Sequence, residues 1–298
     1  MNNMSLIEFK QEYCLEFMSS ISDVYPEELQ AKIFYDVIAV QNEDTRLAPP
    51  FKSSKNIVWG LDVGKMRNES VLTIAEVVNA THYFNLNGDP IVEEIVNEDY
   101  SNVKEVKYKK LDIKWRVEFA LGTDYSDIED YIAYELPTFF PNIKRGVVDA
   151  TGIGEAIYEQ IEKKVRRSKK SYPIESFKFT KENKKIIVEH SVAVMERGDV
   201  QIRYNERLHK EMSGYKRQKT DSDNITYEKT YGSDDYVDSM NLCIYNVYLG
   251  LNFSPPVIVK NMPKTIMKRF NGDRNRWNQQ AINKPNKQVM MNNLRRRF

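Results

Sequence analysis

Five aspartates stand where short apolar segments end or begin. They are Asp62, after residues 57–61; Asp149, after residues 147–148; and Asp234, Asp235 and Asp238, which open an apolar run to Leu249. A carboxylate at the end of a buried strand is unfavourable unless it is paired, hydrogen-bonded or bound to a cation. Converging carboxylates repel one another, and oxygen ligands suit Mg²⁺ or Mn²⁺. We therefore expect a site for two such ions, which cleave phosphodiesters by activating water and stabilising the leaving oxygen.

Strands and helices alternate around these aspartates. Strands are predicted at residues 56–63, 70–78, 145–150 and 173–179, with one or two more at 103–120. Helices are predicted at residues 126–139, 155–164, 184–197 and 234–249. The pattern indicates an α/β fold with a mixed β-sheet flanked by helices. If the strands that end at Asp62 and Asp149 are neighbours, about 4.8 Å apart, their carboxylates share a site.

Each aspartate also has a structural interpretation. Asp149 precedes a run of small residues and is a turn-forming type. Asp234 is an N-cap type at the start of a helix, and the segment from Asp62 to Gly64 is typical of a hairpin turn. One such coincidence is ordinary. Three of them in this order on α/β elements favour a shared site.

Composition and motifs exclude several classes of function. The chain contains no G-x-x-x-x-G-K-[ST] loop, and Gly152 and Gly154 lack the third glycine of a dinucleotide motif, so we expect no nucleotide cofactor. No apolar run reaches the length of a membrane span, and acids among the first thirty residues argue against a signal peptide. Cys14 and Cys243 are far apart and match no zinc spacing, which favours two buried thiols.

The two ends of the chain differ from the middle. Residues 5–40 show helical periodicity, with a helix start at residues 25–28, and residues 41–55 have a linker composition. Residues 259–298 carry eleven Lys and Arg and one Asp, a charge of +10, whereas the whole chain carries +1. This charge predicts either a polyanion-binding tail or a solvated tail without a partner. We expect a helical segment and linker at 1–45, a catalytic domain at 46–258 and a basic tail at 259–298.

Four segments resemble the nuclease domain of the viral, phage-type terminase large subunit, a member of the ribonuclease H-like superfamily. They are residues 59–70 (WGLDVGKMRNES), 146–154 (GVVDATGIG), 233–239 (SDDYVDS) and 9–17 (FKQEYCLEF). The resemblance covers residues 5–250. The third segment, at its distance from the second, is the most specific part of it.

The resemblance implies a ribonuclease H-like endonuclease that cuts double-stranded DNA during viral genome packaging, in the cytoplasm of the infected host cell. Asp62, Asp149 and Asp235 would be the principal ligands of two Mg²⁺ or Mn²⁺ ions, with Asp234 and Asp238 as further candidates. The choice between Asp234 and Asp235 stays open. Glu69 would hold a water ligand. An ATPase motor domain, the portal or the small terminase would be partners.

The sequence departs from this family in two ways. It has no ATPase half, so we do not expect this chain alone to be a complete packaging motor. It has Ser233 where a histidine is common, which argues against a proton shuttle there.

Basic residues near the acidic segments are candidates for phosphate contacts, which give salt-sensitive binding without sequence preference. In the turn after Asp62 and in a predicted hairpin at residues 213–231 they are Lys65, Arg67, Lys216, Arg217 and Lys219. A further basic run occupies residues 163–170 and is a candidate for phosphate contact too, although a charge run of this kind is usually a solvated helix face. Two alternatives remain open: a RuvC-type Holliday-junction resolvase, and a non-catalytic DNA-binding or scaffold domain of the same fold.

Overall fold

The computed structural model describes residues 21–35, 49, 52–64, 68–84, 90–91, 104–219 and 225–249. Its strands are β1 (Ile21–Asp23), β2 (Phe34–Tyr35), β3 (Asn56–Asp62), β4 (Ser70–Phe84), β5 (Pro90–Ile91), β6 (Lys104–Phe119), β7 (Ile143–Asp149), β8 (Ile174–Phe177), β9 (Val200–Arg203), β10 (Tyr215–Lys219) and β11 (Ile225–Lys229). Its helices are α2 (Glu27–Ile33), α3 (Tyr125–Asp130), the π-helical segment η3 (Tyr131–Glu135), α4 (Leu136–Phe139), α5 (Gly154–Arg167), α6 (Lys181–Glu196), α7 (Glu206–Ser213) and α8 (Asp235–Tyr248).

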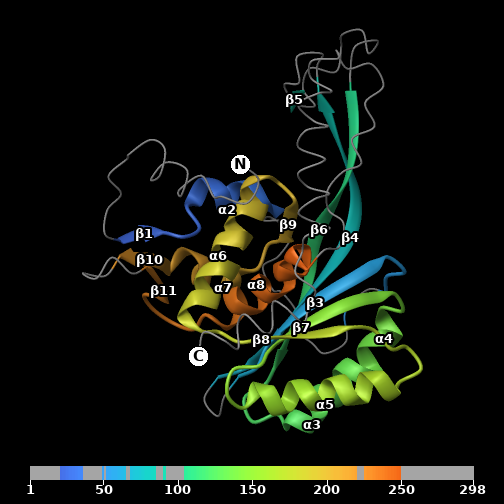
Figure 1. The fold of residues 1–298 in the computed structure, drawn as a ribbon. Coiled ribbons are helices and arrows are strands. Elements are labelled where there is room, and N and C mark those ends of the chain that lie inside the picture. Colours follow the sequence, from blue (N-terminus) through green and yellow to red (C-terminus); the bar gives the residue numbers. More distant parts are fainter. Residues whose placement is uncertain are drawn as a thin grey trace, which may run out of the picture. The chain divides into compact units, whose positions relative to one another are not determined.

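Seven strands follow one another across a mixed sheet in the order β2-β9-β6-β4-β3-β7-β8, and β5 pairs with β4. β3 runs antiparallel to β4 and parallel to β7, and β7 runs parallel to β8. A smaller sheet has the order β1-β10-β11. Helices flank the large sheet (Figure 1). These features confirm the predicted α/β fold with a mixed β-sheet flanked by helices.

The chain forms two compact units. The first contains residues 1–80 and 108–255, and the second contains residues 81–107 and 256–298. All five aspartates belong to the first unit. In the second unit, β5 pairs with β4 through Ile91 and Tyr83. The domain boundaries expected after residues 45 and 258 stay a prediction, and the basic tail lies outside the described residues.

Side chains on β3 alternate between the two faces of the sheet, as the pleat requires. Ile57, Trp59 and Leu61 enter a core that they share with α3, η3, α4 and α5. Val58 enters a second core, shared with α2, α6, α7 and α8. The same alternation puts Gly60 and Asp62 on the α8 side. The sheet therefore separates two cores, and the carboxylate of Asp62 belongs to the face that α8 covers.

Two glycines permit backbone approaches that any larger residue would block. A Cβ atom at Gly60 would lie 2.2 Å from the backbone nitrogen of Cys243 and 2.6 Å from the carbonyl oxygen of Ser239. A Cβ atom at Gly146 would lie 2.0 Å from the indole ring of Trp59. Helix α8 consequently packs directly on the backbone of β3, two residues before Asp62.

The N-terminal part departs from the helical expectation. Helix α2 begins at Glu27 after Pro26, as the residue types at 25–28 predict. Residues 21–23 and 34–35 are strands rather than helix, because β1 pairs with β10 and β2 pairs with β9. These tertiary pairings override the local periodicity. Residues 1–20 and 36–48 of the expected segment lie outside the described residues.

Most other elements follow the predicted pattern. The expected helix at 126–139 is a continuous run of α3, η3 and α4, whose π-helical turn precedes Pro137, a residue without an N–H for the helical ladder. The hairpin at 213–231 is confirmed as β10 and β11. β9 and α7 are not predicted by the periodicity. Cys243 is buried, as expected, whereas Cys14 lies outside the described residues.

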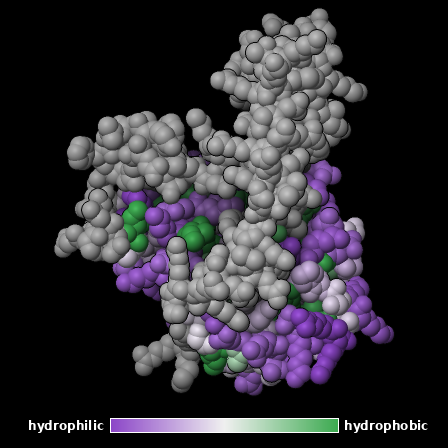
Figure 2. All heavy atoms as spheres, viewed as in Figure 1, coloured by the Kyte–Doolittle hydropathy of each residue, from purple (hydrophilic) through white to green (hydrophobic). Residues whose placement is uncertain are grey.

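The described surface of the first unit is mainly hydrophilic, most evidently over α3 and α5 (Figure 2). In this part of the chain no helix is both long and apolar enough to cross a membrane.

Candidate active site

Two of the aspartates end neighbouring parallel strands. Leu61 of β3 is the register partner of Val148 of β7, so the next residue on each strand, Asp62 and Asp149, lies at the same edge of the sheet. Val147 belongs to the core on the α8 side, and the alternation along β7 puts Asp149 on that side too. The expectation that these strands adjoin is therefore confirmed.

Helix α8 begins above this edge, because the glycine contact at Gly60 holds it against β3. Asp235 and Asp238 in its first turn are buried, with 5% and 8% of their surface exposed. We call the following residues the acid cluster: Asp62, Asp149, Asp234, Asp235 and Asp238. A hydrogen bond of 2.8 Å between Thr73 Oγ1 and Ser239 Oγ ties α8 to β4 beside them.

The pKa of Asp62 reflects the proximity of the other four carboxylates. The pKa of the Asp62 carboxyl lies well above its ordinary value, and burial is the largest cause. The other causes are the negative charges of Asp238, Asp149, Asp235 and Asp234. Asp62 forms no hydrogen bond or ion pair with another described residue. It is a half-buried carboxylate among like charges, and it lacks a cation from the described part of the chain.

Asp234 and Asp238 have cationic partners. Lys184 Nζ of α6 lies 3.1 Å from Asp234 Oδ2 and 3.2 Å from Asp238 Oδ2, and Lys229 Nζ lies 3.1 Å from Asp234 Oδ1. Burial acts to raise the pKa of Asp234, but the two lysines lower it below the ordinary value. Burial is the largest influence on Asp238 and raises its pKa despite Lys184.

Asp235 is held more loosely. Asn68 Nδ2 donates to its Oδ1 at 3.4 Å, and Arg207 Nη2 lies 3.9 Å from its Oδ2. Burial and then the charge of Asp234 raise the pKa of Asp235. Asp235 therefore resembles Asp62, whose pKa is also raised, more than Asp234, whose pKa is lowered by two lysines.

The structure tests the alternative structural roles of the aspartates, as N-cap and as turn residues. Asp234 occupies the N-cap position of α8, as the N-cap interpretation expects, but its side chain makes no capping hydrogen bond. The turn interpretation of Asp149 is right for one oxygen, because the N–H of Thr151 donates to Asp149 Oδ1 at 2.8 Å. The turn after β3 is joined to β4 by the N–H of Gly64, which donates to Ser70 Oγ at 3.0 Å.

Arg207 and Glu211 of α7 lie beside the acid cluster, and the sequence patterns did not identify them. Arg207 Nη1 lies 2.7 Å from Glu69 Oε2 and 2.7 Å from Glu118 Oε2. Glu69, predicted to hold a water ligand, is therefore placed next to the cluster and ion-paired. Asn205 caps α7 by accepting from the N–H of Leu208, and this Asn was the available signal for the helix.

The predicted DNA-contact residues are only partly described. Lys65 and Arg67 lie outside the described residues, as does the side chain of Lys219. Lys216 forms an ion pair with Asp23, and Arg217 is buried. Their role in DNA binding stays a prediction.

The basic run at 163–170 lies away from the acids. β7 and β8 are parallel, so α5 carries the chain back across the sheet from Gly154 to Arg167. Its fourteen residues span about 20 Å at 1.5 Å per residue. Lys164 pairs with Glu129 and Asp130. This run is thus a solvated helix end and does not reach the acid cluster.

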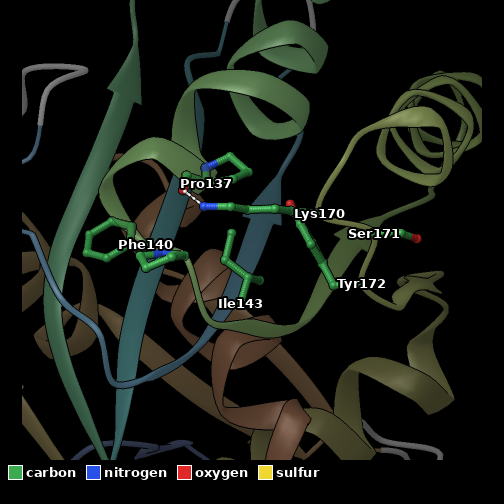
Figure 3. A pocket seen from close by; sticks show the side chains of 7 residues that line it. Pro137, Phe140, Ile143, Lys170, Ser171 and Tyr172 are labelled. Carbon is green, nitrogen blue, oxygen red and sulfur yellow. Dashed lines mark hydrogen bonds between the residues drawn. The ribbon is translucent and has the colours of Figure 1, made fainter.

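A shallow pocket lies at this remote edge (Figure 3). It is lined by Pro137, Phe140, Pro141, Ile143, Lys170, Ser171 and Tyr172. Lys170 lies across it and donates to the carbonyl oxygen of Pro137 at 3.2 Å. Ile143 begins β7 and Asp149 ends it, so the pocket is separate from the acid cluster.

The donor chemistry of the acid cluster fits a hard divalent cation. All its side-chain donors are carboxylate oxygens, the ligands that Mg²⁺ and Mn²⁺ prefer. Asp62 is half-buried and has no cationic partner among the described residues. As the described side chains stand, no three His, Cys, Asp or Glu residues form a group that could hold a metal ion. Rotation of the carboxylates is needed for several to reach one ion.

Comparisons with known proteins give structural matches only. No protein-family model and no curated protein matches the chain. The large terminase nuclease of the thermophilic phage G20c matches with a TM-score of 0.49 and 18% identity, over 75% of this chain and 97% of that one. The nuclease domain of the Thermus phage P74-26 large terminase matches with a TM-score of 0.46 and 17% identity, over 77% and 97%. The HK97 bacteriophage large terminase matches with a TM-score of 0.43 and 14% identity, over 75% of this chain and 43% of that one. The chain is similar in structure to large terminase nucleases of phages, the proteins that its acidic segments also resemble.

Proposed function

We propose that this chain is a divalent-metal-dependent endonuclease that cleaves double-stranded DNA during viral genome packaging. The observation that carries the proposal is the acid cluster. Asp62 and Asp149 end adjacent parallel strands, and α8 adds three more carboxylates above them. The raised pKa of Asp62 supports their proximity. Such a concentration of buried negative charge is unfavourable without a cation, and it suits a reaction in which cations are bound.

Within this proposal, Asp62, Asp149 and Asp235 hold two Mg²⁺ or Mn²⁺ ions, and Asp238 contributes from one turn along α8. The ions would polarise a phosphoryl oxygen and lower the pKa of a bound water. Asp235 is preferred over Asp234 because two lysines already neutralise Asp234. Lys184 pairs with Asp234 and Asp238 and so limits the repulsion within the cluster. Glu69 accepts from Arg207 and would orient a water ligand only if that pair opened.

Double-stranded DNA would be held by sequence-independent contacts. Lys65, Arg67, Lys216, Arg217 and Lys219 stay the proposed phosphate contacts, with the basic tail as a further one. In an infected cell the proposed partners are an ATPase motor domain, the portal and the small terminase. The tail contacts either DNA or one of these proteins.

The direct test is cleavage of supercoiled plasmid by the purified chain. We expect nicking and then linearisation with Mg²⁺ or Mn²⁺, without ATP and with little sequence preference. Asp127→Asn is a matched control, because Asp127 is an exposed acid on α3, which packs on the other face of the sheet. Cleavage that persists in excess EDTA, or that requires ATP, contradicts the proposal. Strong preference for four-way junctions replaces it with a resolvase.

A further inference from the structure

The N-terminus of α8 is capped by a side chain from another helix. Glu211 Oε2 accepts from the backbone N–H of Tyr236 at 2.9 Å and of Val237 at 3.2 Å. Glu211 Oε1 accepts from Ser233 Oγ at 2.7 Å. The first N–H groups of a helix have no partner within it, and a carboxylate there also interacts favourably with the helix dipole. Glu211 thus does for α8 what Asp234, the residue at the N-cap position, does not.

The contacts of Glu211 lie on both sides of Asp234 and Asp235 in the sequence. Ser233 precedes Asp234 and Asp235, and the N–H of Tyr236 belongs to the peptide unit that follows Asp235. Holding that peptide plane and Ser233 together limits the backbone rotation of the two residues between them. Glu211 thus restrains the backbone segment from which the Asp235 side chain extends.

Arg207 lies one turn earlier on α7 and fixes Glu211 in turn. Arg207 Nε donates to Glu211 Oε1 at 3.4 Å, and Arg207 Nη2 donates to Ser233 Oγ at 3.2 Å. Its guanidinium lies over the ring of Tyr236, 4.7 Å from the centroid. The same group bonds Glu69 and Glu118, which joins α7 to the start of β4 and to β6. A planar guanidinium with several donors makes this set of contacts, which the single ammonium of lysine cannot reproduce.

We infer that Glu211, held by Arg207, is a positioning residue that orients Asp235 for metal binding. This inference rests on the proposed function. Glu211 itself is occupied by α8 and Ser233, so it acts through Asp235 and is not a ligand. Because Glu211 of α7 makes the capping hydrogen bonds at the start of α8, the side chain of Asp235 is not needed as a cap and is left for the ion.

The test combines three measurements on Glu211→Ala, Glu211→Gln and the wild type. They are amide hydrogen exchange at Tyr236 and Val237, calorimetric titration with Mn²⁺ alone, and the kcat and KM of plasmid nicking. In Glu211→Ala we expect exchange to be at least about tenfold faster and Mn²⁺ binding about tenfold weaker. We expect kcat to fall about tenfold with KM within twofold. Glu211→Gln keeps an acceptor oxygen and should stay within about threefold of the wild type.

The control is Glu206→Ala, which removes an exposed acid of the same helix that pairs with Lys210. It should match the wild type in all three measurements. Faster exchange with unchanged Mn²⁺ affinity and kcat would make Glu211 a structural cap and overturn the inference. If Glu211→Ala does not fold, Arg207→Lys decides: an unchanged kcat overturns the inference, and a tenfold loss supports it. A wild type that neither binds Mn²⁺ nor nicks DNA would instead refute the proposed function.

Discussion

Asp62 and Asp234 belong to one acid cluster but have opposite surroundings. Asp234 contacts two lysines, and its pKa is lowered. Asp62 contacts no cation among the described residues, and its pKa is raised. The helix acids lie next to α6, α7 and β11, which bring Lys184, Arg207 and Lys229. The fold thus supplies lysines to Asp234 and Asp238 on the helix side and leaves Asp62, on the strand side, to an external cation.

The largest expected effect comes from the strand side. Asp62→Asn should lower the nicking rate by at least about 100-fold, because it removes a ligand of the metal ions whose charge stabilises the transition state. It should leave DNA affinity in EDTA within twofold. The melting temperature of the metal-free protein should stay the same or rise, because a crowded like charge is removed. Asp149→Asn should behave similarly. Nicking time courses and calorimetric melting curves measure both effects, and a variant that unfolds while its soluble fraction cuts normally would contradict the assignment.

Asp235 and Asp234 are adjacent in the sequence, but only Asp234 is paired with lysines. Comparing their variants therefore tests whether a carboxylate without a lysine partner is the metal ligand. Asp235→Asn should lower nicking about as much as Asp62→Asn, by about 100-fold. Asp234→Asn should lower it less than about tenfold, because its charge is already paired with two lysines. Single-turnover rates at saturating Mn²⁺ give both values. The reverse order of the two variants would assign the ligand role to Asp234.

Lys184 tests the helix side of the cluster directly. Lys184→Met should reduce the free energy of unfolding by about 3 kcal/mol, because it leaves the buried carboxylate of Asp238 without its lysine and Asp234 with Lys229 alone. Lys185→Met is the matched control on the same helix. Lys185 is 43% exposed and lies 3.8 Å from Glu189, so its loss should cost about 0.5 kcal/mol or less. Urea unfolding in EDTA measures both values, and equal losses would show that Lys184 is not a buried counter-ion.

The smallest expected effect is that of the basic tail. Removal of residues 259–298 should weaken DNA binding and reduce its salt dependence, by about one unit of slope for each phosphate that the tail neutralises. Nicking at low salt should persist, because the acid cluster precedes the tail. Fluorescence anisotropy titrations from low to moderate salt compare the two forms. If the two forms bind DNA with equal affinity and equal salt dependence, the tail does not bind DNA, and a protein partner becomes the proposal for it.

The strand-end acids were predictable because they combine two local signals. An apolar run followed by an acid marks Asp62 and Asp149, and the parallel pairing of their strands brings them together. The cationic partners were not predictable in the same way. Lys184 and Arg207 are ordinary helix residues in the sequence, and their roles arise only when α6 and α7 pack beside α8.

The short elements show the same limit. β1, β2 and β9 contain three, two and four residues, and each exists through its partner strand rather than through a periodic pattern. Asp234 stands at the N-cap position, as its residue type predicts, but residue type alone cannot reveal that a carboxylate from another helix makes the capping hydrogen bonds. Tertiary contacts, not local propensity, decide such positions.

The contact between Gly60 and α8 has a consequence for motion at the site. With no side chain between the two backbones, α8 cannot slide or roll along β3 without atomic overlap. The Cα positions of Asp62, Asp235 and Asp238 are therefore fixed relative to one another, and side-chain torsion is the soft coordinate that remains. Rotamer changes take picoseconds to nanoseconds, whereas domain rearrangements take microseconds or longer. Capture of an ion at this site is thus a matter of carboxylates turning within a rigid frame, and its rate should follow the dehydration of the ion rather than the motion of the protein.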